Sequence, residues 1–272
     1  MFGSIKLFTV RGIPIRAHFT ALLLVVLLVA DMGAFGVPAG LLLMLSILLH
    51  ELGHALMGRR FGVQTRSIDL HILGGTAFMQ ELPKKPRHEI LIALAGPAVS
   101  AALAGLGALG LALTSARLSF GGASWSGVLS FFTAMNLSMT LFNLIPALPM
   151  DGGRVLRAAL ALRMGPLNAT RVAVSLARAI AVVFIVGGIY IGALTLPLIG
   201  IMVFSAAGAE MRMAQAREMR RQQEELLQRF GFGLRAAPAG AFGGAGPVID
   251  VTPGRSVEIV DEPPRAGWRW PR

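Results

Sequence analysis

Residues 41–58 read LLLMLSILLHELGHALMG, and this stretch combines an apolar run long enough to enter a bilayer with the motif His-Glu-x-x-His. On an α-helix the fourth residue along returns to nearly the same face, so His50 and His54 present two imidazoles to one point. Neutral imidazole nitrogens at this spacing suit Zn²⁺. Glu51 lies on a neighbouring face, where its carboxylate can act as a general base toward a water molecule at the metal.

The motif alone is only moderately specific, because His-Glu-x-x-His also occurs by chance on surface helices of soluble proteins. The apolar setting argues against chance. Each ionisable side chain costs roughly 2–3 kcal/mol or more at bilayer depth, so three of them without a compensating partner would make a poor membrane segment. A catalytic metal site accounts for all three.

Two histidines do not complete a tetrahedral zinc site, so a third protein ligand must come from another apolar part of the chain. Asp151 is the candidate, within residues 142–154, FNLIPALPMDGGR, where two prolines and a glycine pair interrupt a hydrophobic segment. Broken helices at membrane depth are tolerated only where they line a cavity or the protein interior. Asp151 could instead cap the helix that begins at Gly152, and the two roles are compatible.

The two motifs, in this order and both within apolar segments, resemble those of the site-2 protease family of intramembrane zinc metalloproteases. The second motif is N-x-x-P-x-x-x-x-D-G at residues 143–152, and the resemblance covers roughly residues 10–212. It implies one Zn²⁺ per chain, held by His50, His54 and Asp151, with Glu51 as the catalytic base.

The resemblance also implies that Asn143 and Pro146 hold the substrate strand or its developing oxyanion. The residues alone leave this open, since an Asn before a helix break can satisfy freed backbone groups.

The family includes forms with PDZ or CBS domains. Here the interval between the second and third apolar segments is too short for a PDZ domain, and the C-terminal tail is too poor in apolar residues for paired CBS domains. We therefore expect a compact form without either.

The composition is that of a basic membrane protein: 54% of the 272 residues are hydrophobic and the net charge is +11. In a soluble protein this charge would suggest nucleic acid, but the basic residues gather between apolar stretches and no nucleic-acid motif accompanies them. We expect the lipid bilayer as a partner and no nucleic acid. The chain has no cysteine, so any zinc must be held by histidine and carboxylate.

The apolar pattern predicts an all-α polytopic membrane protein with about six transmembrane helices and a small re-entrant β-hairpin between helices 2 and 3. The first segment could mimic a signal peptide, but it is too long and lacks a cleavage site, so we expect a retained span. Basic loop residues place both termini in the cytoplasm of a multi-pass protein of the cell membrane. The predicted core, residues 1–212, has spans at 17–37, 39–59, 90–113, 128–164 (broken), 172–191 and 193–208, followed by a charged cytosolic helix at 213–230 and a disordered tail at 231–272.

Residues 63–82 change to a period of two, with Ile68 and Leu70 alternating with polar neighbours, and Gly74-Gly75 reads as a two-residue turn. This predicts the β-hairpin. The resemblance implies that it lies beside the cleft and pairs with an unwound substrate by strand addition; an ordinary interfacial hairpin is the alternative. His71, within it, is better explained as a polar surface residue than as a ligand.

Together these features predict zinc-assisted hydrolysis of peptide bonds in or near the transmembrane segments of single-span membrane proteins, in regulated intramembrane proteolysis. Two alternatives remain. A catalytically silent scaffold that binds client helices would not need Glu51, and a metal-ion transporter more often shows internal repeats with paired broken helices, whereas one break is visible here. The substrate, the activating signal and the oligomeric state are not readable from the sequence.

Overall fold

The structure is a computed structural model that describes residues 4–71, 74–79, 83, 85–114 and 124–229. The chain divides into two compact units, Met1–Arg212 and Met213–Arg272. The elements in chain order are β1 Ser4–Val10, β2 Ile13–His18, α1 Phe19–Met32, the short 3₁₀ helix Gly33–Phe35, α2 Gly36–Arg60, β3 Thr65–His71, β4 Gly74–Met79, α3 Pro86–Leu113, α4 Trp125–Asn143, α5 Asp151–Met164, α6 Pro166–Tyr190 and α7 Thr195–Arg229.

The helices α1 and α2 form an antiparallel hairpin around the short 3₁₀ helix. Glycines of α2 allow the two backbones to approach closely: a Cβ at Gly36 would lie 2.2 Å from the carbonyl oxygen of Leu28, and one at Gly40 would lie 3.0 Å from Val25 Cγ2. Small residues at a helix contact are typical of membrane helices. The apolar N-terminal region therefore forms two helices, as the first two predicted spans require.

A four-stranded sheet in the order β1-β2-β3-β4 packs against α2. The β1–β2 and β3–β4 pairs are antiparallel, and β2 lies parallel to β3. Alternate strand residues point inward, so that Ile15 and Ile68 are fully buried in one cluster with Ile47 and Leu48 of α2. The sheet is thus attached to the helix that carries the His-Glu-x-x-His motif.

The sheet differs from the prediction in two ways. The hairpin between α2 and α3 is present, but Gly74 and Gly75 do not form its turn; they begin β4 and pair with His71 and Leu70. The connection falls at residues 72–73, outside the described residues. The pair β1–β2, at residues 4–18, was not predicted at all, because its basic residues were interpreted only as the flank of a membrane span.

The helix α3 packs against α2, α4 and α5. Its contacts again depend on glycine. A Cβ at Gly53 of α2 would lie 2.9 Å from the carbonyl oxygen of Ala95, and a Cβ at Gly107 would lie 2.3 Å from Thr133 Oγ1 of α4. These close approaches make α3 the central helix of this part of the chain.

The segment predicted as a broken span, residues 128–164, consists of two helices, α4 and α5, joined by residues 144–150. The first turn of α5 lies directly on the backbone of this connection. A Cβ at Gly152 would lie 2.3 Å from the carbonyl oxygen of Leu144, and one at Gly153 would lie 2.4 Å from the carbonyl carbon of Ala147. This packing fixes the start of α5, whose first residue is Asp151.

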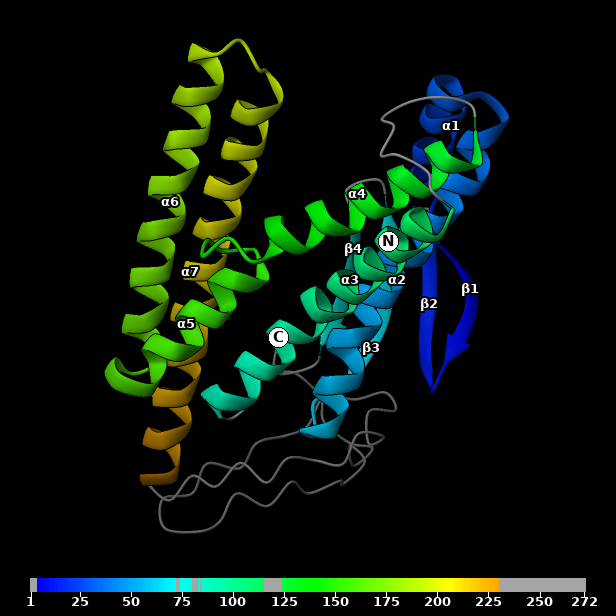
Figure 1. Cartoon of the computed structure of the whole chain (residues 1–272). Helices are drawn as coiled ribbons and strands as arrows, with labels where there is room; N and C mark the ends of the chain where they lie inside the picture. The colour runs from blue at the N-terminus through cyan, green and yellow to red at the C-terminus, as the bar shows by residue number, and fades with distance from the viewer. Residues whose placement is uncertain (1–3, 72–73, 80–82, 84, 115–123, 230–272) are drawn as a thin grey trace, which may run out of the picture. The chain divides into compact units, whose positions relative to one another are not determined.

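The helices α6 and α7 lie side by side as an antiparallel pair (Figure 1). Near their connection a Cβ at Gly188 would lie 2.3 Å from Pro197 Cδ. Leu148 and Met150, from the connection before α5, are buried in a cluster with side chains of α6 and α7. The charged helix predicted at 213–230 is the continuation of α7, which ends at Arg229, and the tail predicted at 231–272 lies outside the described residues.

Four helical stretches among the described residues are long and apolar enough to cross a membrane: Phe19–Arg60, Pro86–Leu113, Pro166–Tyr190 and Thr195–Leu227. The first contains both α1 and α2. The helix α4 is not among the four, because the face that it buries carries polar side chains such as Thr133 and Asn136. The number of six crossings therefore stays a prediction.

Candidate metal centre

The helix α2 presents His50 and His54 on the side that faces α3. The spacing of four residues places the two rings one turn apart, and their Nε2 atoms are 3.2 Å from each other. Both residues are buried, with 4% and 7% of their surface exposed. Two imidazoles at this depth need partners for their ring nitrogens.

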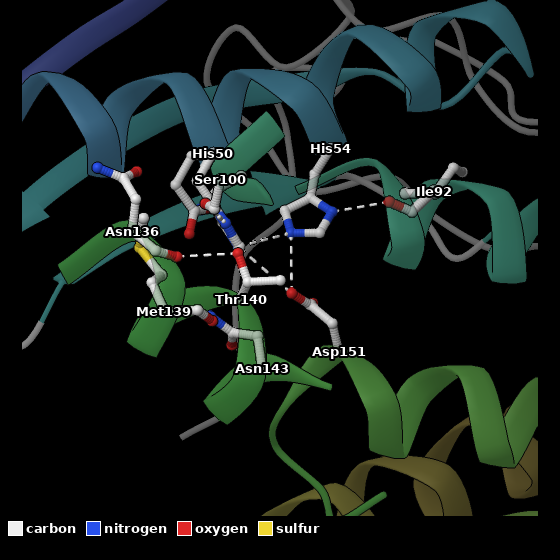
Figure 2. Close-up of polar contacts among 11 residues, drawn as sticks. His50, His54, Ile92, Ser100, Asn136, Met139, Thr140, Asn143 and Asp151 are labelled. Atoms are coloured by element: carbon white, nitrogen blue, oxygen red, sulfur yellow. Dashed lines mark hydrogen bonds and ion pairs between the residues drawn. The ribbon is translucent and has the colours of Figure 1, made fainter. Parts of the chain in front are cut away.

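Asp151 completes the group from the start of α5. Its Oδ2 lies 3.3 Å from His50 Nε2 and 3.2 Å from His54 Nε2. Figure 2 shows the carboxylate and the two rings pointing toward one another across the space between the helices. Among the described residues, these three form a group whose ligand atoms all lie within 4.8 Å of one another. The structure thus brings together the three residues predicted as ligands.

The group fits a zinc ion in size and in chemistry. Ligands about 2.0–2.1 Å from a tetrahedral zinc are separated from each other by about 3.3 Å, and the three measured separations are 3.2, 3.2 and 3.3 Å. Three atoms with lone pairs so close together repel one another unless a cation or a proton lies between them. Imidazole and carboxylate are also the ligands available for zinc in a chain without cysteine.

The orientation of both rings is set by α3. Ser100 Oγ lies 2.8 Å from His50 Nδ1, and the carbonyl oxygen of Ile92 lies 2.7 Å from His54 Nδ1. The Ile92 carbonyl can only accept, so His54 Nδ1 carries the proton and its Nε2 keeps a lone pair for a metal. The same arrangement follows for His50 when its Nδ1–H donates to Ser100. Such partners are the usual means by which proteins fix metal-ligating histidines.

Gly96 makes room for the two rings. A Cβ at this position would lie 2.2 Å from His54 Nε2 and 2.7 Å from His50 Nε2. Ile92, Gly96 and Ser100 are four residues apart, so they share one face of α3. From the sequence, Gly96 with Pro97 resembles a family feature of the helix beside the zinc site, whereas the contacts of Ile92 and Ser100 with the histidines were not predicted. The signal that could have indicated them is this spacing of small and polar residues in an apolar helix.

Glu51 lies under the edge strand β4. Its Oε2 accepts a hydrogen bond of 3.1 Å from the backbone N–H of Ala77. A Cβ at Gly75 would lie 2.6 Å from Glu51 Cγ, so only glycine fits there without displacement of the glutamate. Within the part of the chain that the structure describes, β4 pairs only with β3. The N–H of Ala77 points to Glu51 and not to β3, so it belongs to the other edge of β4, which is the free edge of the described sheet. The catalytic candidate and the free edge are therefore in direct contact.

Asn143 and Pro146 lie at the end of α4 and in the connection that follows it. Asn143 is half-buried, and its Nδ2 donates to the carbonyl oxygen of Met139, 2.9 Å away (Figure 2). Pro146 is exposed. The contact of Asn143 is the local backbone contact that the sequence allowed as an alternative, and the substrate-binding roles of the two residues stay predictions. His71 lies on β3 near Thr76 of β4, with His71 Nε2 3.1 Å from Thr76 Oγ1.

A buried group of two histidines and an aspartate, set between apolar helices with a glutamate beside the first histidine, defines a membrane metallopeptidase site. The chain belongs to Peptidase family M50, which matches residues 38–119 and 118–187. The predicted membership of the site-2 protease family and the predicted fold class, a polytopic helical membrane protein with a small β-sheet, are both confirmed.

Individual relatives agree with this assignment. The chain is 34% identical over 217 residues to zinc metalloprotease MJ0392 of Methanocaldococcus jannaschii, across 78% of this chain and 62% of that protein. It is 32% identical over 117 residues to stage IV sporulation protein FB of Bacillus subtilis, across 43% of this chain and 38% of that protein. The solved structure of the site-2 protease from Methanocaldococcus jannaschii matches with a TM-score of 0.57 and 33% identity, covering 76% of this chain and 95% of that one. The chain spans about six-tenths of the length of the curated relatives that it matches over most of its own length.

Proposed function

We propose that this protein is an intramembrane zinc metalloprotease that hydrolyses peptide bonds in or near the transmembrane segments of other membrane proteins. The observation that supports this most directly is the convergence of His50, His54 and Asp151 at separations of 3.2–3.3 Å, next to Glu51 in sequence. A relative that shares a third of the aligned residues is named a zinc metalloprotease. In this proposal one Zn²⁺ per chain is held by the two histidines and the aspartate.

Zinc held in such a site would polarise a carbonyl group and would lower the pKa of a water molecule far below its ordinary value, to about 7. The other steps belong to the chain. Glu51 takes a proton from the attacking water and delivers it to the nitrogen of the leaving amine, which is the general base and general acid role of a metallopeptidase glutamate. Ser100 and the Ile92 carbonyl hold the histidine rings in place during the reaction.

The free edge of β4 is the proposed place for the substrate backbone. A protease needs an extended substrate, and an edge strand offers unpaired N–H and C=O groups to which an unwound segment can add. The contact between Ala77 N–H and Glu51 places this edge at the catalytic glutamate. Asn143 and Pro146 are proposed to contact the same substrate segment or its oxyanion.

The remaining parts of the proposal concern the setting. The substrates are single-span membrane proteins, cleaved in regulated intramembrane proteolysis. The protein lies in the cell membrane with both termini in the cytoplasm, residues 1–212 form the proteolytic core, and the charged end of α7 lies in the cytosol. The many arginines and lysines between the apolar segments support this orientation.

The test is the variant Glu51→Gln, expressed together with a single-span substrate. We expect it to retain zinc and to lose cleavage by a factor of at least 100, because the amide cannot accept the proton of water. Asp31→Asn is the matched control, since Asp31 is an exposed carboxylate on α1. Full cleavage by Glu51→Gln would show that Glu51 is not the catalytic base. No cleavage by the unaltered chain would favour the scaffold, and zinc flux into vesicles that contain the purified protein would favour the transporter.

A further inference from the structure

One face of α3 carries four residues at the spacing of a helical row: Glu89, Ile92, Gly96 and Ser100. Three of them make the contacts with the histidines described above. The fourth, Glu89, forms an ion pair with Arg157 of α5, through Glu89 Oε1 and Arg157 Nη2.

We propose that the Glu89–Arg157 pair is a positioning device that holds α5 so that Asp151 stays within ligand distance of the two histidines. This rests on the metal site of the proposed function. In this arrangement α3 orients all three ligands, two through direct contacts with the rings and the third through a neighbouring helix.

The pair is buried. Only 8% of the Arg157 side chain and 15% of the Glu89 side chain are exposed. The Nε of Arg157 has no hydrogen-bond partner among the described residues. A buried ion pair with an unsatisfied donor is weak evidence for stability, because apolar residues of similar volume often stabilise a protein as well or better. The contribution that distinguishes a charged pair here is its defined geometry.

The geometry of α5 explains how the pair acts on Asp151. A helix is a stiff rod with a rise of 1.5 Å per residue, so Arg157 lies about 9 Å along the axis from Asp151. The glycines after Asp151 fix the beginning of this rod, and Arg157 fixes its second turn, whereas the last residues, from Leu162 to Met164, are exposed. Two fixed points determine the direction of the helix, and therefore the place of its first carboxylate.

Glu89, the α3 member of the pair, also borders the metal site. A cavity of about 20 Å³ is lined by Glu89, Arg154, Asp151 and His54, together with other residues. This volume holds about one water molecule. Glu89 is thus separated from two of the proposed ligands by no more than a single water-sized space. A movement of Glu89 therefore displaces these ligands as well.

The experiment measures zinc binding rather than cleavage, on the purified full-length chain in detergent. The dissociation constant for zinc is obtained by competition with a chromophoric chelator, and the absorption spectrum with Co²⁺ reports the ligand geometry. We expect Arg157→Met to weaken zinc binding by about 10- to 100-fold, as for other groups that support metal ligands, and to alter the Co²⁺ spectrum. Arg163→Met is the matched control on the same helix, since Arg163 is exposed.

A double-mutant comparison separates positioning from general damage. If Arg157 acts through Asp151, then Arg157→Met causes no further loss of zinc affinity in an Asp151→Asn background. The proposal is overturned if Arg157→Met binds zinc as tightly as the unaltered chain, or if the loss is equally large in the Asp151→Asn background.

If Arg157→Met does not fold, a charge-reversed double variant tests the proposal instead. The double variant Glu89→Arg with Arg157→Glu restores the pair, and we expect it to recover zinc binding to within tenfold. Glu89→Gln breaks the same pair from the α3 side, and we expect it to weaken zinc binding by a similar factor to Arg157→Met. A folded charge-reversed protein that binds zinc as poorly as Glu89→Gln contradicts the proposal. An unaltered chain that binds zinc but cleaves no substrate would refute the proposed function and leave this inference standing.

Discussion

At the scale of single residues, the absence of a side chain at position 96 is as important as the ligands themselves. We predict that Gly96→Ala abolishes stoichiometric zinc binding, because the added methyl group would lie 2.2 Å from His54 Nε2 and 2.7 Å from His50 Nε2. Zinc content of the purified protein measures this. Gly105→Ala on the same helix is the control, since a Cβ there meets nothing within 4 Å; equal zinc contents in the two variants would show that the space beside the rings is not needed.

The residues that could be predicted from the sequence are those whose chemistry demands a particular side chain at a particular spacing. His50, Glu51 and His54 form such a pattern, and Asp151 stands at a break that a membrane segment needs a reason to contain. The structure brings the two histidines and the aspartate together. Their orienting partners could not be predicted in the same way, because a hydroxyl is common in apolar helices and every residue has a backbone carbonyl, as Ile92 does.

At the scale of elements, long apolar helices are easier to locate from the sequence than short strands. The helix α3 begins four residues before the predicted span and ends with it, since twenty or more apolar residues leave little ambiguity. The hairpin β1–β2 was missed although Arg11 and Gly12, both with positive φ, mark its turn. The two strands have only seven and six residues, and so few residues give too little alternation to be distinguished from the basic flank of a membrane segment.

The edge strand β4 supports a prediction about the substrate. Ala77→Pro removes the N–H that donates to Glu51, and a proline in the edge strand hinders the addition of a further strand there. We expect kcat/KM for cleavage of a single-span substrate to fall at least tenfold while the zinc content stays unchanged, because none of the proposed ligands lies on β4. Ala77→Ser keeps the N–H and serves as the control. Unchanged kcat/KM in the proline variant would mean that the substrate does not use this edge.

At the scale of the whole molecule, six predicted spans compare with four long apolar helical stretches, the first of which contains two of the predicted spans. The one predicted span that is not among them, 128–164, is missing for a physical reason. The helices α4 and α5 bury polar and charged groups against other helices, including Asn136, which donates to Ser46 of α2, and Arg157. Helices that are covered by protein need not be apolar on that face. Hydropathy alone therefore does not identify such helices as membrane segments, although α5 carries Asp151 of the metal site.

The orientation of the chain in the membrane can be tested directly because the sequence contains no cysteine. A thiol reagent therefore labels only the single cysteine that is introduced. Leu194→Cys places a thiol in the connection between α6 and α7, where residue 194 is 82% exposed. Glu218→Cys places one at a half-buried position on the charged part of α7. With both termini in the cytoplasm, a membrane-impermeant maleimide labels the first variant in intact cells and the second only after the cells are permeabilised. This follows because basic residues favour the cytoplasmic side and flank α7 after residue 212, whereas residues 191–194 carry no charge. Labelling of Glu218→Cys in intact cells would show that the chain has the opposite orientation. It would also contradict the expectation that the metal centre lies nearer the cytoplasmic face, at the end of α2 that carries Arg59 and Arg60.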